Sequence, residues 1–469
     1  MPYQTTGLAY AIFGISLSAL ILSSLSARLH AKKSLPFLLS SISLVAISLS
    51  SYILLVSSAG GIFLGTFRVY PFSLLFAMLV SFLLFLVNVL AFQGSDDYGS
   101  FLTLFGFAAL GMFSVIFAYS LLAIFIGIEA MIITTSLMAV IEHKHHVEAA
   151  VKLFIMGSIA AAAFAFGLSL LLPFSSSLSL SAISSGITGS GRYLVSLSLI
   201  LIAAALSFEA GLFPFNLWLP DVYEGSPAYL TAMMSGVNKK VAFAAILSML
   251  FITFGYYLHS LSLLLVLLAA STMLFGNLLA LVQTSVKRMM AYSSISQAGY
   301  IMVGIAVATQ YGIESSIFQI FAHAFMAIGA FSIILWLEKR NIKTIGDYSG
   351  LASRNGFTAL SLTIILLSLA GIPPLAGFDG KFLLFTSAAY SNLVLLAFFG
   401  VINSFISLYY YWKVISSVYS ERYKPRMHME TGIAFVILVS VLFIVLVGVY
   451  PQPLLSLAGT ASRSLLSLM

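Results

Sequence analysis

The chain has 469 residues, of which 61% are hydrophobic and only 7% are charged, with a formal net charge of +7. A soluble globular protein carries roughly 25% charged residues, so this composition excludes a water-soluble surface. The chain has no cysteine, which excludes disulfides, thiolate metal sites and iron–sulfur clusters built from its own residues.

The apolar residues fall in runs of about 20, the length that an α-helix needs to cross a hydrocarbon core of about 30 Å. Membrane β-barrel strands would be shorter and would alternate in polarity. The runs therefore predict an all-α polytopic membrane protein of about fourteen transmembrane helices. In chain order the spans are expected at 7–26, 35–57, 69–92, 100–118, 120–141, 150–173, 193–219, 228–256, 258–282, 289–309, 315–337, 357–389, 391–414 and 431–456.

Two features of these runs need interpretation. The fourth and fifth spans form one apolar stretch, Phe101 to Ile141, which we divide near Tyr119 and Ser120 because it is about twice the length that one span needs. The first run, Gly7 to Leu25, lacks a preceding basic region and is interpreted as a span and not as a cleaved signal. The Ser-rich segment Ser175 to Ser190 is expected to be a flexible outer loop.

The basic residues gather in alternate loops, which predicts that those loops are cytoplasmic. The opposite side holds only Arg68, Arg192 and Arg463, so both termini are expected outside the cytoplasm. The acidic loop Gln93 to Ser100 does not fit this bias. The cytoplasmic set is Arg28, Lys32, Lys33, Lys144, Lys152, Lys287, Arg288, Lys339, Arg340, Lys343, Arg354, Lys413, Arg422, Lys424 and Arg426.

This loop bias explains the net charge without a nucleic-acid partner. The sequence has no P-loop, no glycine-rich dinucleotide motif and no H-E-x-x-H metal motif, so nucleotide hydrolysis by this chain is not expected. The cluster His143, Lys144, His145 and His146 could suggest a metal, but at a helix end in a cytoplasmic loop we interpret it as solvated.

Several ionisable residues fall within or beside predicted spans, where each costs at least about 2.5 to 3.5 kcal/mol near a helix centre. Such residues face a bundle interior or water and are candidates for function, although each could instead form a salt bridge that only joins helices. The set is Glu129, Glu209, Lys239, Lys240, His323, Asp379 and Lys381.

Two spans also carry helix breakers beside these charges. In LSFEAGLFPFNLWLP, Gly211 and Pro214 follow Glu209, and in LSLAGIPPLAGFDGKF, Gly371 and Pro374 precede Lys381. Interrupted helices in two halves of a membrane protein are typical of inverted-repeat transporters with ion sites near the midplane. Carboxylates, ammonium groups and an imidazole together favour protons over sodium, which needs only oxygen ligands.

At these motifs the chain resembles the antiporter-like membrane subunits of respiratory complex I and its relatives, and among them the NuoN type. The stretches that carry the resemblance are LAIFIGIEA, LFPFNLWLPDVYEGSP, NKKVAF, VKRMMAYSSISQAGY and LSLAGIPPLAGFDGKF, and it covers roughly residues 60 to 415. The resemblance implies two inverted five-helix repeats with broken helices 7 and 12. The expected units are N-terminal helices at 1–99, the repeats at 100–256 and 258–414, and a C-terminal loop and helix at 415–469.

By the same resemblance, Glu129 matches the fifth-helix glutamate, Lys240 the eighth-helix lysine and Lys381 the twelfth-helix lysine of a proton relay. The resemblance implies a subunit of an NADH:quinone oxidoreductase-like translocase in the cell membrane, with no cofactor or metal of its own. Sibling membrane subunits and a peripheral iron–sulfur arm are the implied partners, and lipid surrounds the chain. Whether the chain counts as an enzyme, and which electron donor and quinone it serves, stays open.

The chain departs from the family pattern at the seventh-helix lysine, where it has Glu209. Glu129 and Glu209 could share a proton, or Lys239 could supply the missing cation, although adjacent helical residues point about 100° apart. Asn216 and Asp379 are further differences, and His323 looks more like the NuoM-type sibling. The alternatives are a subunit of an Mrp-type cation/proton antiporter or a membrane-bound hydrogenase, or a scaffold subunit that does not conduct.

Overall fold

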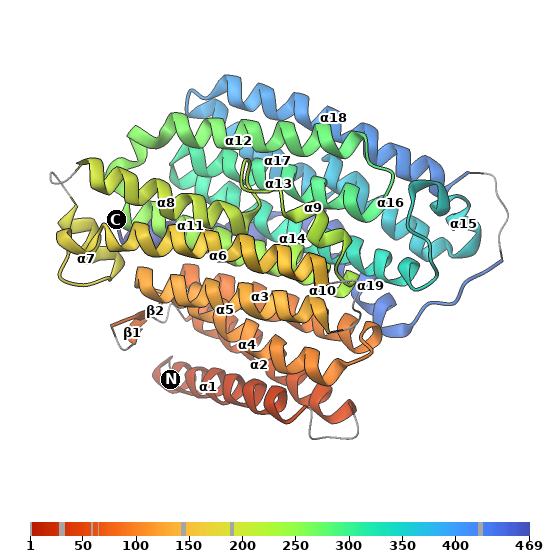
Figure 1. The fold of residues 1–469 in the computed structure, drawn as a ribbon, viewed down its shortest axis with the longest axis horizontal. Coiled ribbons are helices and arrows are strands. Elements are labelled where there is room, and N and C mark those ends of the chain that lie inside the picture. Colours follow the sequence, from red (N-terminus) through yellow and green to blue (C-terminus); the bar gives the residue numbers. More distant parts are fainter. Residues whose placement is uncertain are drawn as a thin grey trace.

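The protein, seen in a computed structural model, is a bundle of long helices that run side by side (Figure 1). The structure describes residues 2–27, 33–57, 60–63, 65–141, 147–187, 192–420 and 425–469. Within them, thirteen helices are long and apolar enough to cross a membrane, and α16 and α17 together make the remaining predicted span. The prediction of an all-helical polytopic membrane protein is therefore confirmed.

The first half of the chain begins with helices that pack as consecutive neighbours, with a short hairpin between the second and third. Its elements are α1 (Pro2–Ser26), α2 (Ser34–Val56), β1 (Gly61–Phe63), β2 (Phe67–Val69), α3 (Pro71–Gly94), α4 (Tyr98–Phe117), α5 (Leu121–Val140), α6 (Val147–Ser169), α7 (Leu180–Gly186), α8 (Arg192–Ala210), α9 (Leu219–Glu224), α10 (Ala228–Met233) and α11 (Lys239–Ser248). Two π-helical segments, Met234–Asn238 and Met249–Thr253, flank α11 and continue the same span.

The second half places two long buried helices, α13 and α14, at the centre of the bundle (Figure 1). Its elements are α12 (Leu258–Leu281), α13 (Val286–Val307), α14 (Gln310–Glu338), α15 (Leu351–Arg354), α16 (Gly356–Ala370), α17 (Ala376–Tyr390), α18 (Val394–Val418), α19 (Thr431–Val449) and α20 (Gln452–Leu466). The division into two inverted repeats stays a prediction.

Both predicted helix breaks are present. Helix α8 ends at Ala210, where Gly211 has a left-handed φ of 70°, and α16 ends at Ala370, where Gly371 has a φ of 90°. Glycine adopts this conformation without a Cβ clash. The chain then needs several residues before α9 and α17 begin, so backbone groups beside each break lie outside regular helix.

The long apolar run also divides near the expected place, because α4 ends at Phe117 and Ser120 caps α5. The Ser-rich segment that follows α6 was predicted to be a flexible loop, which is wrong for Leu180–Gly186. Leu180 and Ile183 are buried, so this stretch forms α7. The backbone N–H of Leu180 also donates to the carbonyl of Tyr119 at 3.0 Å, which holds the segment against the α4–α5 turn.

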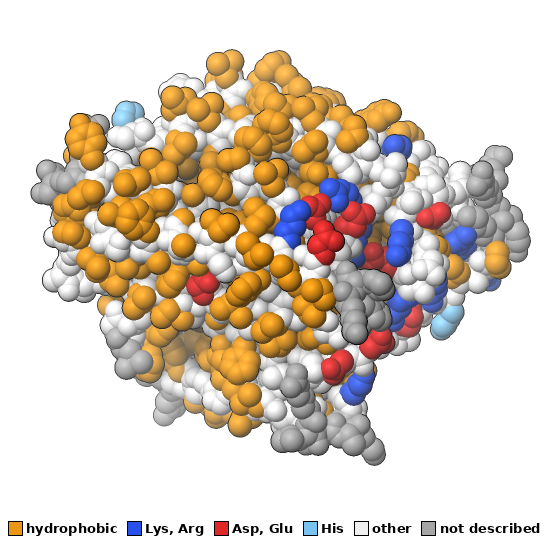
Figure 2. All heavy atoms as spheres, viewed as in Figure 1, with side chains coloured by type: hydrophobic (Ala, Val, Ile, Leu, Met, Phe, Trp, Pro, Cys, Tyr) orange, Lys and Arg blue, Asp and Glu red, His pale blue; other side chains and the backbone are white. Residues whose placement is uncertain are grey.

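A second difference lies at the C-terminus, where the last predicted span ends at Val449 and the amphipathic helix α20 follows Pro451. Alternation of the spans brings both ends of the chain to the same end of the bundle (Figure 1). Lysine and arginine gather toward the opposite end, and the surface between is mostly apolar (Figure 2). The acidic Gln93 to Ser100 loop lies among those cations, since Lys33 and Lys339 donate to the carbonyls of Asp96 and Gln93 at 2.8 and 2.6 Å.

Candidate functional site

The predicted relay residues differ in burial. Glu129 and Asp379 are half-buried, whereas the other five are almost completely inside the protein. Their exposed fractions are 4% for Glu209, 2% for Lys239, 0% for Lys240, 2% for His323 and 3% for Lys381. A buried ammonium group or imidazole needs polar partners, because desolvation without them is costly. The partners therefore indicate how these residues are arranged.

Lys240 and His323 are in direct contact. Nζ of Lys240, on α11, lies 2.5 Å from Nδ1 of His323, on the central helix α14. Two basic groups at this distance can share a hydrogen bond only if one of them is without a proton at that atom. The pair can therefore pass a proton from one nitrogen to the other, which is the elementary step of a relay.

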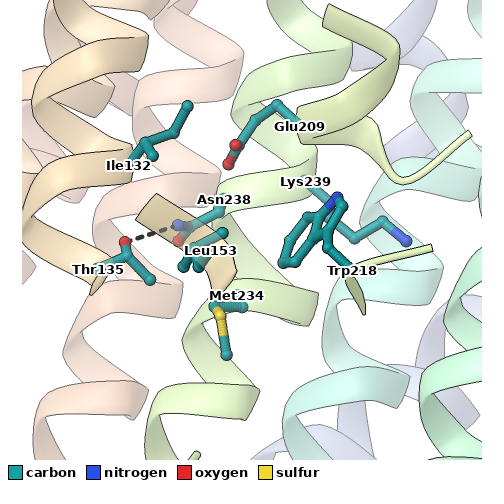
Figure 3. A pocket seen from close by; sticks show the side chains of 8 residues that line it. All are labelled: Ile132, Thr135, Leu153, Glu209, Trp218, Met234, Asn238 and Lys239. Carbon is teal, nitrogen blue, oxygen red and sulfur yellow. Dashed lines mark hydrogen bonds between the residues drawn. The ribbon is translucent and has the colours of Figure 1, made fainter. Parts of the chain in front are cut away.

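Lys239 points in another direction, as the 100° step between adjacent helical residues predicts. Its Nζ donates to the carbonyl and the hydroxyl of Ser294 on α13, at 2.8 and 3.0 Å. The amine also lies beside the first helix break, because a Cβ at Gly211 would be 3.1 Å from it. In Figure 3, the amine of Lys239 extends past Trp218 and away from Glu209. No ion pair joins Lys239 to Glu209 among the described residues.

Glu209 instead faces a small cavity that Lys239, Asn238 and Thr135 also line (Figure 3). The cavity volume is about 10 Å³, which is close to the room that one water molecule needs. Nδ2 of Asn238 donates to the hydroxyl of Thr135 at 3.1 Å. Glu129, the carboxylate that the sequence pairs with Glu209, is not among the residues that line this cavity.

Lys381 occupies the second helix break. Its Nζ donates to the carbonyls of Leu369 and Ala370 at 2.9 and 3.0 Å, and to the hydroxyl of Ser404 at 2.8 Å. The amine also lies 4.5 Å from the centre of the Tyr300 ring, a cation–π distance. Because α16 ends at Ala370, the two carbonyls are free to accept from the lysine and need not bond within the helix.

Asp379 is not joined to Lys381 by a hydrogen bond or ion pair within the described residues. Its Oδ2 is buried without a hydrogen-bond partner there. Residues two apart on a helix point about 200° apart, which places the carboxylate on the other side of α17. Asn216, which follows the first break, likewise has a buried Oδ1 with no hydrogen-bond partner in the described part of the chain.

Sequence reasoning missed the uncharged polar residues of the site. Ser294, Gln297, Tyr300, Gln319 and Ser404 lie in predicted spans, but a count of charges does not find them. Their signal is polarity within apolar helices, where such side chains form contacts between helices.

The sequence-based prediction was also wrong about Lys287. This residue was predicted to be a loop cation, but only 5% of its surface is exposed. This lysine lies 3.0 Å from Oε1 of Glu338 and donates to the carbonyl of Ser226. The reason is that α13 begins one residue before it, at Val286, so Lys287 is part of the helix packing and not of a loop.

A neighbouring charge cluster joins α6, α9 and α13. Asp221 accepts from Lys152 and forms an ion pair with Arg288 at 2.9 Å, and Arg288 also contacts Glu224 at 2.9 Å. Burial alone would raise the pKa of Asp221, but the two cations outweigh it and hold this pKa below its usual value.

The histidine cluster at 143–146 lies outside the described residues. Within the residues that the structure describes, no group of three or more His, Asp or Glu side chains could hold a metal ion.

The chain matches the family model described as NADH:quinone oxidoreductase/Mrp antiporter, transmembrane, over residues 118–407. The chain belongs to this family. NADH-quinone oxidoreductase subunit N of Desulforamulus reducens is 35% identical over 77% of this chain and 77% of its own. NAD(P)H-quinone oxidoreductase subunit 2 of Gloeobacter violaceus is 37% identical over 87% and 82%. F(420)H(2) dehydrogenase subunit N of Methanosarcina mazei is 34% identical over 84% and 83%.

Solved structures of membrane complexes contain chains with the same fold. A chain of respiratory complex I from Thermus thermophilus with bound aureothin is 28% identical with a TM-score of 0.80, over 95% of this chain and 99% of that one. A chain of the Mrp complex from Dietzia has a TM-score of 0.90 over 98% of both chains, but at 19% identity this likeness concerns the fold alone. The resemblance to antiporter-like subunits and to the subunit N type is therefore confirmed.

Proposed function

We propose that this chain is a proton-translocating membrane subunit of a complex I-type quinone oxidoreductase. The observation that carries the proposal is the contact between Lys240 and His323, two buried basic groups 2.5 Å apart on helices at the centre of the bundle. A buried pair that can hold one proton or two is of little use as a structural contact, since two apolar residues would pack there without the cost of desolvation.

The other buried groups extend this pair in two directions. On one side, Lys239 reaches the first helix break, and the cavity that Glu209 faces is also lined by residues of α5, the helix that carries Glu129. On the other side, Lys381 binds the carbonyls of the second break. We propose that Glu129, Glu209, Lys239, Lys240, His323 and Lys381 are relay groups, each taking a proton from one neighbour and passing it to the next. Asp379 is proposed as an accessory acceptor, because its buried oxygen lacks a partner among the described residues.

The energy would come from redox chemistry in partner subunits, because this chain has no cysteine for an iron–sulfur cluster. The relatives' names include NADH, NAD(P)H and F(420)H(2) as electron donors, so the subunit type serves more than one donor. We propose sibling antiporter-like subunits and a peripheral iron–sulfur arm as partners. The chain is proposed to lie in the cell membrane with both termini outside.

The test is proton pumping by the intact complex in proteoliposomes, measured together with quinone reduction. Lys240→Met and Lys381→Met are expected to lower the ratio of protons to electrons while the complex still assembles. Wild-type ratios in both variants would refute the relay.

A second candidate is a subunit of an Mrp-type antiporter, because the description of the matching family includes the Mrp antiporter beside NADH:quinone oxidoreductase. Identification of the co-purifying subunits separates the two. A quinone-site subunit and an iron–sulfur arm would support the oxidoreductase, and their absence from a complete, active complex would support the antiporter.

A further inference from the structure

Two buried glutamines lie beside Lys381. Gln297 on α13 and Gln319 on α14 are both 0% exposed. Nε2 of Gln319 donates to Oε1 of Gln297 at 3.0 Å, and Nε2 of Gln297 donates to the carbonyl of Leu369 at 3.0 Å. That same carbonyl accepts from Nζ of Lys381 at 2.9 Å. The amide pair is thus linked to the lysine through one shared oxygen.

The orientation of both amides follows from this contact. A backbone carbonyl only accepts hydrogen bonds, so Gln297 must turn its NH₂ group toward Leu369 and its oxygen toward Gln319. Gln319 must then turn its own NH₂ group toward Gln297. Its Oε1 is left on the far side, buried and without a hydrogen-bond partner among the described residues.

The free oxygen of Gln319 points at the backbone of α17 immediately before Lys381. A Cβ at Gly380 would collide with this oxygen, so a larger residue there would force the amide of Gln319 to move. On α14, Gln319 precedes His323 by four residues, which places both side chains on the same face of the helix. The amide pair therefore lies between Lys381 and the Lys240–His323 pair.

We propose that Gln297 and Gln319 are positioning residues that join Lys381 to the Lys240–His323 pair, and that Oε1 of Gln319 accepts a hydrogen bond in the conducting state. The donor is an O–H or N–H group, either a water molecule or the ammonium of Lys381. An amide does not titrate near neutral pH, so the glutamines hold this donor in line and the proton itself moves between His323 and Lys381. This inference rests on the proposed function.

The test uses the intact complex in proteoliposomes, with the ratio of protons to electrons as the readout. Gln319→Leu removes the free acceptor. Gly380→Ala keeps the amide but forces it to move, and alanine is favourable within helix α17. Each is expected to lower proton pumping relative to quinone reduction by about tenfold, the effect of one lost hydrogen bond at the upper end of the usual range, while assembly is retained.

Two matched controls remove similar groups elsewhere. Asn88→Leu deletes another fully buried amide, which bonds to Ser40, Ser41 and Tyr98 on the first helices. Gly14→Ala adds a Cβ where nothing lies within 4 Å. Both are expected to keep the wild-type ratio. The double variant Gly380→Ala with Gln319→Ala removes the collision but still lacks the acceptor oxygen of Gln319, so pumping should stay low. If Gln319 had a purely structural role, pumping by the double variant would recover.

The lysine variants of the proposed function are measured in parallel. If Lys240→Met and Lys381→Met lose pumping but Gln319→Leu and Gly380→Ala do not, the role of the glutamines is refuted and the relay stands. If the lysine variants pump normally, the proposed function itself fails. Should Gln319→Leu not assemble, Gly380→Ala decides the question, and a wild-type ratio in that variant overturns the inference.

Discussion

Lys381 allows the sharpest separation of a proton carrier from a structural cation. Its ammonium makes three hydrogen bonds at 2.8 to 3.0 Å. Hydrogen bonds to a charged group contribute about 1.5 to 3 kcal/mol each, and they oppose the cost of burying the ammonium. A structural cation would keep its proton in this position, whereas a carrier must be able to release it.

Removal of this lysine should not leave the helix break without donors. The carbonyl of Leu369 also accepts from Gln297 at 3.0 Å, and the carbonyl of Ala370 also accepts from Ser404 at 2.9 Å. Lys381→Met therefore removes the desolvation cost together with the hydrogen bonds, and no backbone oxygen is orphaned. We expect the variant to fold and assemble, with a change in stability within about 2 kcal/mol.

Lys381→Arg completes the test, because arginine keeps a positive charge and hydrogen-bond donors but does not release its proton in proteins. If Lys381 carries protons, both variants should reduce pumping in proteoliposomes at least tenfold, a rise of about 1.4 kcal/mol in the barrier. Lys413, exposed near the end of α18, provides the matched controls Lys413→Met and Lys413→Arg. Normal pumping by Lys381→Arg would refute the carrier role and leave a structural cation.

Three further predictions concern the first break, the topology and the charge cluster. Lys239→Met is expected to lower pumping as much as Lys240→Met, and full pumping in both Lys239→Met and Glu209→Gln would remove this site from the mechanism. This chain has no cysteine, so single cysteines can report the topology. Ser176→Cys, at an exposed position, should react with an impermeant thiol reagent added outside intact cells, whereas Gly346→Cys should react only after permeabilisation. The reverse result would overturn the predicted orientation, in which both termini lie outside. The pKa of Asp221 is lowered, so its contribution to stability is present above the usual Asp pKa and is lost as pH falls through the lowered value. Asp221→Asn should reduce Tm at neutral pH by about 1 to 3 °C and flatten this acid dependence, and an unchanged Tm–pH profile would contradict the role of the ion pairs.

The spans and the breaks could be predicted from the sequence because each has a strong local cause. Hydrophobic length sets the spans, and glycine with proline sets both breaks. The place of division in the Phe101 to Ile141 run was also within reach, since Ser120 is a good helix cap. By contrast, α7 and α20 depend on a few apolar residues that are buried only by distant parts of the chain, and hydropathy over a long window does not detect them.

The buried ionisable residues were also readable, because a charge in an apolar span is conspicuous. Their partners were not. Lys239 was expected to reach Glu209 if it acted at all, yet it binds Ser294 on α13, a helix that is distant in sequence. Lys287 was counted as a loop cation because no local pattern reveals that Glu338 lies beside it. Side-chain direction and contacts between distant helices are set by tertiary packing, which charge counting does not include.

The two helix breaks explain why this chain has an additional buried lysine. At the second break, a Cβ at Gly371 would be 3.0 Å from Cδ of Lys381, whose amine binds the hydroxyl of Ser404. At the first break, a Cβ at Gly211 would be 3.1 Å from the amine of Lys239, which binds the hydroxyl of Ser294. Each break therefore has a left-handed glycine, a lysine against it and a serine as acceptor. Lys239 lies at the first break and makes no ion pair with Glu209 among the described residues. Glu209 faces the small cavity, and a lysine lies against the left-handed glycine at both interrupted helices.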